Sequence, residues 1–170
     1  MTKLNYNDIQ LAINKQEMKD LNNCLHFFSY QFDNIEYIIP EDNRSDINIT
    51  ATTESNISIE YNVEIKERNC YLNTFPDSII EVDKYNYLVT DKTKIPIYYV
   101  EYKDCIAVYN LSKIDINKVE RRSQQMQKKT MNKSGEKVYK EVYGLTPNLA
   151  TIFNKCNYKK ISNANYQQIK

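Results

Sequence analysis

The 170-residue chain contains two glycines, one histidine and no tryptophan. Gly135 and Gly144 stand apart from each other, which excludes the P-loop and the dinucleotide-binding fingerprint, because both need closely spaced glycines. With His26 as the single histidine, a zinc site built on two histidines is excluded as well. No run of about 18 apolar residues occurs, so we expect no membrane-spanning segment. The polar first residues are not typical of a signal peptide.

The four cysteines are few, and their spacing is wide and irregular: Cys24, Cys70, Cys105 and Cys156. Without a secretion signal we expect free thiols in a reducing compartment instead of a disulfide framework. The predicted location is therefore the cytoplasm, meaning the host-cell cytoplasm if the gene belongs to a phage. The length and the ordinary share of hydrophobic residues, 41%, predict a single domain over residues 1–170.

Charge is divided unevenly along the chain. Residues 1–110 carry 10 basic and 18 acidic side chains, whereas residues 111–170 carry 13 basic and 4 acidic ones. The net charges of these two parts are therefore −8 and +9. A basic C-terminal third indicates a surface for a polyanion, and a solvated basic surface without a partner explains the same charges.

Hydrophobic periodicity predicts an α/β protein with a mixed sheet flanked by helices. Seven elements are expected in a core of about residues 7–111, in the order α-β-β-β-α-β-β: 7–28, 35–39, 46–53, 57–67, 78–89, 95–102 and 105–111. The rest, 112–170, is expected to be a basic extension. It contains a polar helix at 116–129, a strand at 138–142 and a helix that begins at Thr146-Pro147.

The second and third predicted strands both alternate between apolar and polar residues, so one face of each is apolar. If the apolar faces coincide, the loop Glu54–Asn56 makes Thr53 the partner of Ile57. The same register places Asp46 directly opposite Glu64, with Cβ atoms about 4.5–5.5 Å apart. Lys66 follows on the same face.

Two opposed carboxylates repel each other, and together with a lysine they are typical of a site for Mg²⁺ or Mn²⁺, which prefer oxygen ligands. A solvated polar sheet face with a weak surface ion pair is the alternative. Glu17 interrupts the apolar stripe of the first helix, either as a further acid of this site or as a solvated residue at the edge of the stripe. Glu36, on the neighbouring strand, is a rival for that role.

Asp46, followed on the next strand by Glu64-Ile65-Lys66, resembles the D…E-x-K signature of the PD-(D/E)XK nuclease superfamily. The order of the predicted elements within 7–111 is similar to the common core of that family, although Ser45 stands where the motif's name has proline. The resemblance implies a restriction-endonuclease-like fold and Mg²⁺-dependent hydrolysis of DNA phosphodiesters, with Mn²⁺ as a substitute. It implies that Asp46, Glu64 and Glu17 bind the metal and that Lys66 activates water.

On this interpretation the chain is a phage or bacterial endonuclease whose partner is DNA. The basic residues expected to contact DNA phosphates, or else to solvate a helix, are Arg121, Arg122, Lys128 and Lys129. A non-catalytic module on the same fold, which binds nucleic acid or protein, is the alternative function. The sequence leaves open the form of the DNA substrate, endonuclease against exonuclease action, the sequence preference and the oligomeric state, a homodimer included.

Overall fold

The computed structural model describes residues 6–41, 45–127 and 137–161. Within them lie the two α-helices α1 (Tyr6–Gln31) and α2 (Val82–Leu88). The strands are β1 (Asn34–Ile38), β2 (Ile47–Thr52), β3 (Ser58–Glu67), β4 (Ser78–Glu81), β5 (Ile95–Glu101), β6 (Cys105–Asn110), β7 (Glu120–Gln127), β8 (Lys137–Leu145), β9 (Thr151–Asn154) and β10 (Lys160–Ile161). The fold is α/β with a mixed sheet, as the sequence predicted.

The central sheet has seven strands in the order β1-β2-β3-β5-β6-β9-β10. Strands β3 and β5 run parallel, and every other neighbouring pair in this sheet is antiparallel. A parallel pair needs a crossover connection. Here β4 and α2 supply it, and β4 also begins a second sheet with the order β4-β8-β7.

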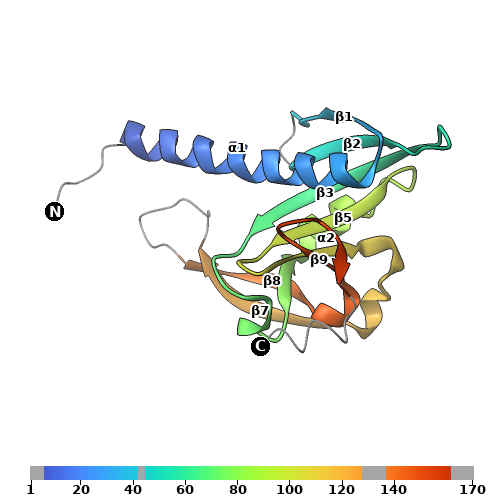
Figure 1. The fold of residues 1–170 in the computed structure, drawn as a ribbon. Coiled ribbons are helices and arrows are strands. Elements are labelled where there is room, and N and C mark those ends of the chain that lie inside the picture. Colours follow the sequence, from blue (N-terminus) through green and yellow to red (C-terminus); the bar gives the residue numbers. More distant parts are fainter. Residues whose placement is uncertain (1–5, 42–44, 128–136, 162–170) are drawn as a thin grey trace.

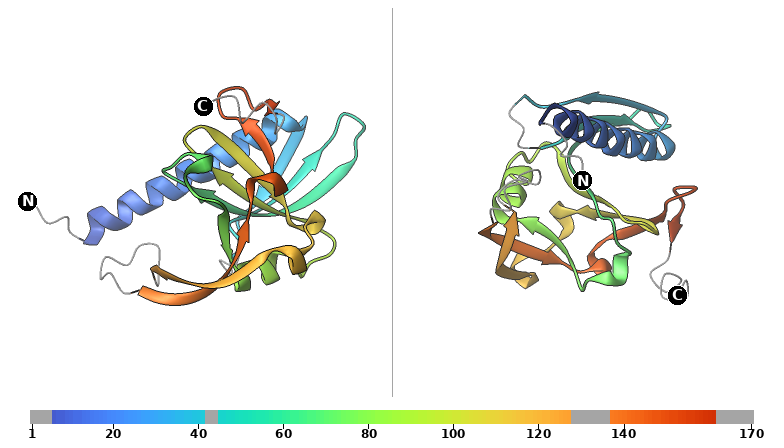
Figure 2. Two further views of the ribbon diagram at one scale, coloured as in Figure 1. Left: turned by 90° about the horizontal axis from the view of Figure 1, so that it is seen from below. Right: turned by 90° about the vertical axis from the view of Figure 1, so that its left-hand side faces the viewer.

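The central sheet is covered on both sides (Figure 1). Helix α1 lies on one side, and the sheet of β4, β8 and β7 lies on the other. Because side chains alternate along a strand, Val63, Ile97 and Tyr99 pack with Phe27 of α1. Tyr98 and Val100 point to the opposite side and pack with residues of α2 and β8, among them Leu88 and Leu145. The two views of Figure 2 show the same separation of α1 from β7 and β8.

The predicted first hairpin is confirmed in its register. Ile47 faces Val63 and Ala51 faces Ile59, as the coincidence of the apolar faces requires. The hairpin of β5 and β6 and the strand β8 also lie where the sequence predicts them. None of the helices in the described part of the chain is long and apolar enough to cross a membrane.

Two predicted helices are wrong, and a third is confirmed only in part. The expected helix at 78–89 begins only at Val82, because Ser78–Glu81 forms β4 against β8. The expected helix at 116–129 is a 3-10 turn (Ile116–Lys118) followed by β7, whose residues alternate between half-buried and exposed positions against β8. Thr146-Pro147 begins one 3-10 turn (Pro147–Leu149), after which β9 joins β6. The part after residue 111 thus contributes strands to both sheets, where the sequence predicted an extension.

Candidate functional site

Asp46 lies directly before β2, where the pairing of β2 with β3 ends. Its backbone N–H donates to the carbonyl of Val63 at 3.1 Å, and its Oδ2 accepts the N–H of Ile65 at 2.6 Å. The carboxylate therefore replaces the backbone acceptor that β2 no longer supplies. Asp46 lies near enough to Glu64 for its charge to act on that carboxyl. The pairing of the two strands begins at Ile47 opposite Val63 and does not extend to Asp46 and Glu64.

Glu64 lies on β3, opposite Tyr98 of β5, on the face of the central sheet turned away from α1. Its side chain is 15% exposed, and Oε2 accepts a hydrogen bond from Nζ of Lys84 at 2.8 Å. Burial raises the pKa of the Glu64 carboxyl to about 7, and the charge of Asp46 adds to this, whereas Lys84 and Lys66 oppose it. Glu64 is thus a carboxyl group that changes its charge near neutral pH.

Lys66 follows on the same face of β3 and is half-buried. Burial lowers the pKa of its ammonium group, as does the positive charge of Arg68, while Glu64 and Asp46 counteract both effects. A lysine whose pKa is lowered loses its proton more readily than an ordinary surface lysine. The structure thus brings together Asp46, Glu64 and Lys66, the three residues of the predicted motif.

Two residues that the sequence analysis missed add charge to this group, Lys84 beside Glu64 and Arg68 near Lys66. Lys84 comes from α2, and no pattern in the sequence places it near Glu64, because the contact depends on how α2 packs against β3. Arg68 continues the alternation of Glu64 and Lys66, so the sequence could have predicted that it lies on the same face of the sheet. Its Nη2 donates to the carbonyl of Ile79 in β4 at 3.3 Å.

Glu17 is not brought to this group. It is exposed on α1, and α1 covers the opposite face of the central sheet, where the apolar side chains of β2 and β3 lie. The helical spacing predicted an inward position, but the inward face of α1 is turned to Val63 and not to Glu64. Glu36 is exposed on β1 and pairs with Thr50, four residues from Asp46, which is about 13 Å along a strand. Neither acid joins Asp46 and Glu64.

The basic residues expected to contact DNA have partners within the protein. Nε of Arg121 lies 3.2 Å from Oε2 of Glu141. The two terminal nitrogens of Arg122 donate to the two carboxylate oxygens of Asp77 at 2.7 and 2.9 Å. Lys128 and Lys129 lie outside the described residues. Arg122 therefore has a structural contact that connects β7 to the residue directly before β4.

The donor set of Asp46 and Glu64 suits Mg²⁺ in number and type. One oxygen of each carboxylate already accepts a hydrogen bond, and the second accepts none from the described residues. Mg²⁺ is commonly held by one or two carboxylates, with water and substrate phosphate as the other ligands. The described residues contain no group of three or more histidines, cysteines and acids placed to hold a metal. A metal here would thus depend on Asp46 and Glu64 and on ligands from outside the protein.

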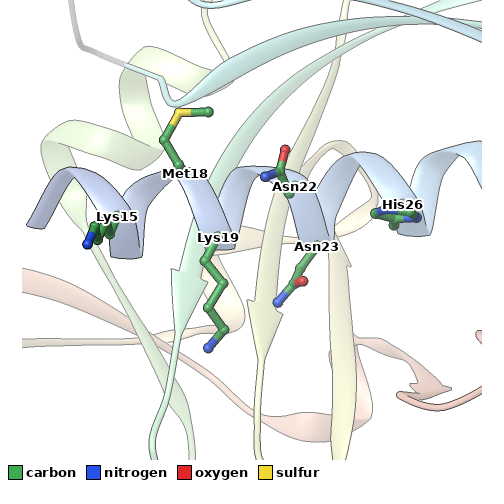
Figure 3. A pocket seen from close by; sticks show the side chains of 6 residues that line it. All are labelled: Lys15, Met18, Lys19, Asn22, Asn23 and His26. Carbon is green, nitrogen blue, oxygen red and sulfur yellow. The ribbon is translucent and has the colours of Figure 1, made fainter. Parts of the chain in front are cut away.

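A shallow hollow runs along the outer surface of α1, and only residues of that helix line it: Lys15, Met18, Lys19, Asn22, Asn23 and His26. Their side chains do not converge, because Met18 and Asn22 point to one side of the helix and Lys19 and Asn23 to the other (Figure 3). Lys19 and Asn23 also have carboxylate partners in β3 and β5, Glu67 and Glu101. The hollow therefore offers no centre for chemistry comparable to Glu64.

Comparison of the chain with protein-family models, with curated proteins and with solved structures finds no match.

Proposed function

We propose that the protein is a Mg²⁺-dependent DNA nuclease that hydrolyses phosphodiester bonds on a restriction-endonuclease-like core. The observation that carries the proposal is the placement of the buried Glu64 carboxyl beside Asp46 and Lys66. Two neighbouring carboxylates cost stability unless a cation binds them, and such groups cluster at functional sites. The order of α1, β1, β2, β3, α2, β5 and β6 supports the same fold, with β4 of the second sheet inserted between β3 and α2.

The roles of the residues follow from their chemistry. Asp46 and Glu64 would hold Mg²⁺, which polarises a phosphoryl oxygen and acidifies bound water. Lys66 would hold the attacking water, and its neutral form would accept one of the water's protons. The oxygen of that water forms a new bond to phosphorus while the bond from phosphorus to the leaving sugar oxygen breaks. That oxygen takes a proton from solvent, so the products are an alcohol and a phosphate monoester.

A non-catalytic nucleic-acid-binding or protein-binding module is the second candidate, and one contact favours it. Lys84 already compensates the charge of Glu64 at 2.8 Å, so the charged group can exist without any bound cation. On this reading Asp46 ends the pairing of β2 with β3, and Lys66 contributes only charge.

A cleavage assay separates the two candidates. Wild type, Lys66→Ala and the control Lys94→Ala are incubated with supercoiled plasmid and end-labelled linear duplex, in Mg²⁺, Mn²⁺ or EDTA. Lys94 is a suitable control because its ammonium group pairs with Asp91 at 3.6 Å and contacts neither carboxylate. We expect nicking or linearisation by wild type and by Lys94→Ala in either metal and none in EDTA. A fall of about 10²–10⁴-fold is expected for Lys66→Ala.

The same proteins are melted with and without Mg²⁺, because a ligand that binds only the folded state raises the melting temperature. Lys66→Ala should keep the Mg²⁺-induced rise, since its carboxylates are intact. Absence of cleavage in both metals, together with unchanged melting temperatures, contradicts the nuclease proposal and leaves the binding module.

A further inference from the structure

Lys84 is held in place by the packing of the short helix that carries it. Val82, Tyr85 and Leu88 of α2 are buried, and Leu88 and Tyr85 belong to the core between the two sheets. This packing fixes the rotation of α2 and leaves Lys84 beside β3, with its side chain 32% exposed. The ammonium group can therefore reach Glu64 and can also turn toward solvent.

Nζ of Lys84 lies at one of the two Glu64 oxygens that a cation could use. It donates to Oε2 of Glu64 at 2.8 Å, while Oδ2 of Asp46 is held by the N–H of Ile65. A divalent cation held by Asp46 and Glu64 would have a positive ammonium group as its neighbour. In a partly buried setting such repulsion is stronger than in water. The ion pair and the cation therefore compete for the same carboxylate.

The charges around Glu64 indicate that a DNA phosphate could draw Lys84 away from it. Asp46 and Glu64 match the charges of Lys66 and Lys84, and the further charges of Arg68 and Glu81 also offset each other, so the group is neutral as a whole. Adding a divalent cation leaves an excess of two positive charges, which a DNA phosphate would reduce. A lysine is a compact point charge on a flexible stem and binds phosphate well.

We propose that Lys84 makes the binding of Mg²⁺ and of DNA depend on each other, an inference that rests on the proposed nuclease function. Without DNA, Lys84 neutralises Glu64 and weakens the binding of Mg²⁺. When a phosphodiester arrives, Lys84 turns to a phosphate oxygen and Glu64 becomes available to the cation. Lys84 is thus a positioning residue, which limits metal binding to the complex with DNA.

Mg²⁺ is titrated calorimetrically into wild type, Lys84→Ala, Lys84→Met and the control Lys94→Ala, all without DNA. We expect the two Lys84 variants to bind Mg²⁺ about tenfold more tightly than wild type, and Lys94→Ala to bind as wild type does. Lys84→Met keeps the apolar stem of the side chain and decides the question if Lys84→Ala does not fold. Damage to the structure alone would weaken Mg²⁺ binding, so a tighter affinity separates competition from a merely structural role.

A second titration adds a 20-base-pair duplex, in a Lys66→Ala background so that the DNA stays intact. The duplex should strengthen Mg²⁺ binding about tenfold or more when Lys84 is present, and by a clearly smaller factor when it is replaced. Equal Mg²⁺ affinities of wild type and both Lys84 variants, with normal binding by wild type, overturn the inference about Lys84 alone. No Mg²⁺ binding by any protein, with or without the duplex, overturns the proposed function itself.

Discussion

Glu64 is a carboxyl group placed where ionisation is unfavourable, between buried side chains of β5 and the charge of Asp46. Lys84 and Lys66 reduce this cost without removing it, because burial is the largest cause of the raised pKa. The free-energy cost of ionising Glu64 makes the stability of the protein depend on pH. A carboxyl group whose pKa is raised in the native state keeps its proton longer than it does in the unfolded chain.

The first prediction at this scale concerns Glu64→Gln in EDTA. The native pKa of about 7 lies above the ordinary value of 4.5, so the native state binds more protons between these two values. The contribution of Glu64 to stability is thus present below pH 4.5 and is lost as the pH rises to about 7. Relative to wild type, Glu64→Gln should gain up to about 3 kcal/mol of unfolding free energy between pH 4.5 and pH 8.

Urea unfolding of both proteins at several pH values measures this difference. Glu60→Gln is the matched control, because Glu60 is exposed on the same strand and the same face as Glu64. Parallel curves of stability against pH for wild type and Glu64→Gln would show that Glu64 ionises without cost.

The proximity of Asp46 and Glu64 was predictable from the hairpin register and from alternation, although the strand pairing stops at Ile47 and Val63. The hydrogen bond from the N–H of Ile65 to Asp46 depends on the residue at which β2 begins, which alternation does not determine. Lys84 was not predictable, because its contact depends on the position of α2 above β3. The exposed position of Glu17 agrees with the alternative of a solvated residue. Helical spacing could not decide between the two alternatives, because it shows which residues share a face but not which side of the sheet the helix covers.

At the scale of elements, the alternation of apolar and polar residues predicted the strands correctly in two hairpins. These hairpins are β2–β3 and β5–β6, and their apolar alternation is clear. Strand β4 was misassigned because its partner β8 lies far along the chain. Strand β7 was misassigned although β8 is the next strand in the sequence. A polar segment such as β7 has no strong apolar pattern of its own, so pairing with β8 decides its structure.

Gly144 in β8 carries a prediction at the element scale. It pairs with Glu120 of β7 and Ile79 of β4, directly beneath the ion pair of Arg122 with Asp77. A Cβ atom at this position would collide with the Asp77 carboxylate and the Arg122 guanidinium group. Gly144→Ala should therefore separate this pair and lower the unfolding free energy by about 1–3 kcal/mol.

Urea unfolding at pH 7 measures the loss, and Gln125→Ala on the exposed face of β7 is the control. The double variant Gly144→Ala/Arg122→Ala should lose less than the sum of the single changes, because both remove the same ion pair. Additive losses would show that the collision with the Arg122–Asp77 pair is not the cause.

At the scale of the whole molecule, α1 and the second sheet cover opposite faces of the central sheet, and the motif residues lie on the face away from α1. The charged groups that act on Glu64, namely Asp46, Lys66 and Lys84, all come from residues 46–84. The edge of the central sheet beyond β6, in contrast, is completed by β9, more than forty residues later in the chain.

This late pairing has a consequence for the protein during its synthesis on the ribosome. Until β9 emerges, the edge of β6 has no partner, and an unpaired edge strand favours association with other chains. A fragment of residues 1–111 also lacks β8, which is the partner of β4. We expect this fragment to be mostly insoluble when expressed, whereas the fragment 1–161 stays soluble, and sedimentation of lysates measures both. A soluble, cooperatively unfolding 1–111 fragment would show that the nascent chain can fold before its last third has left the ribosome.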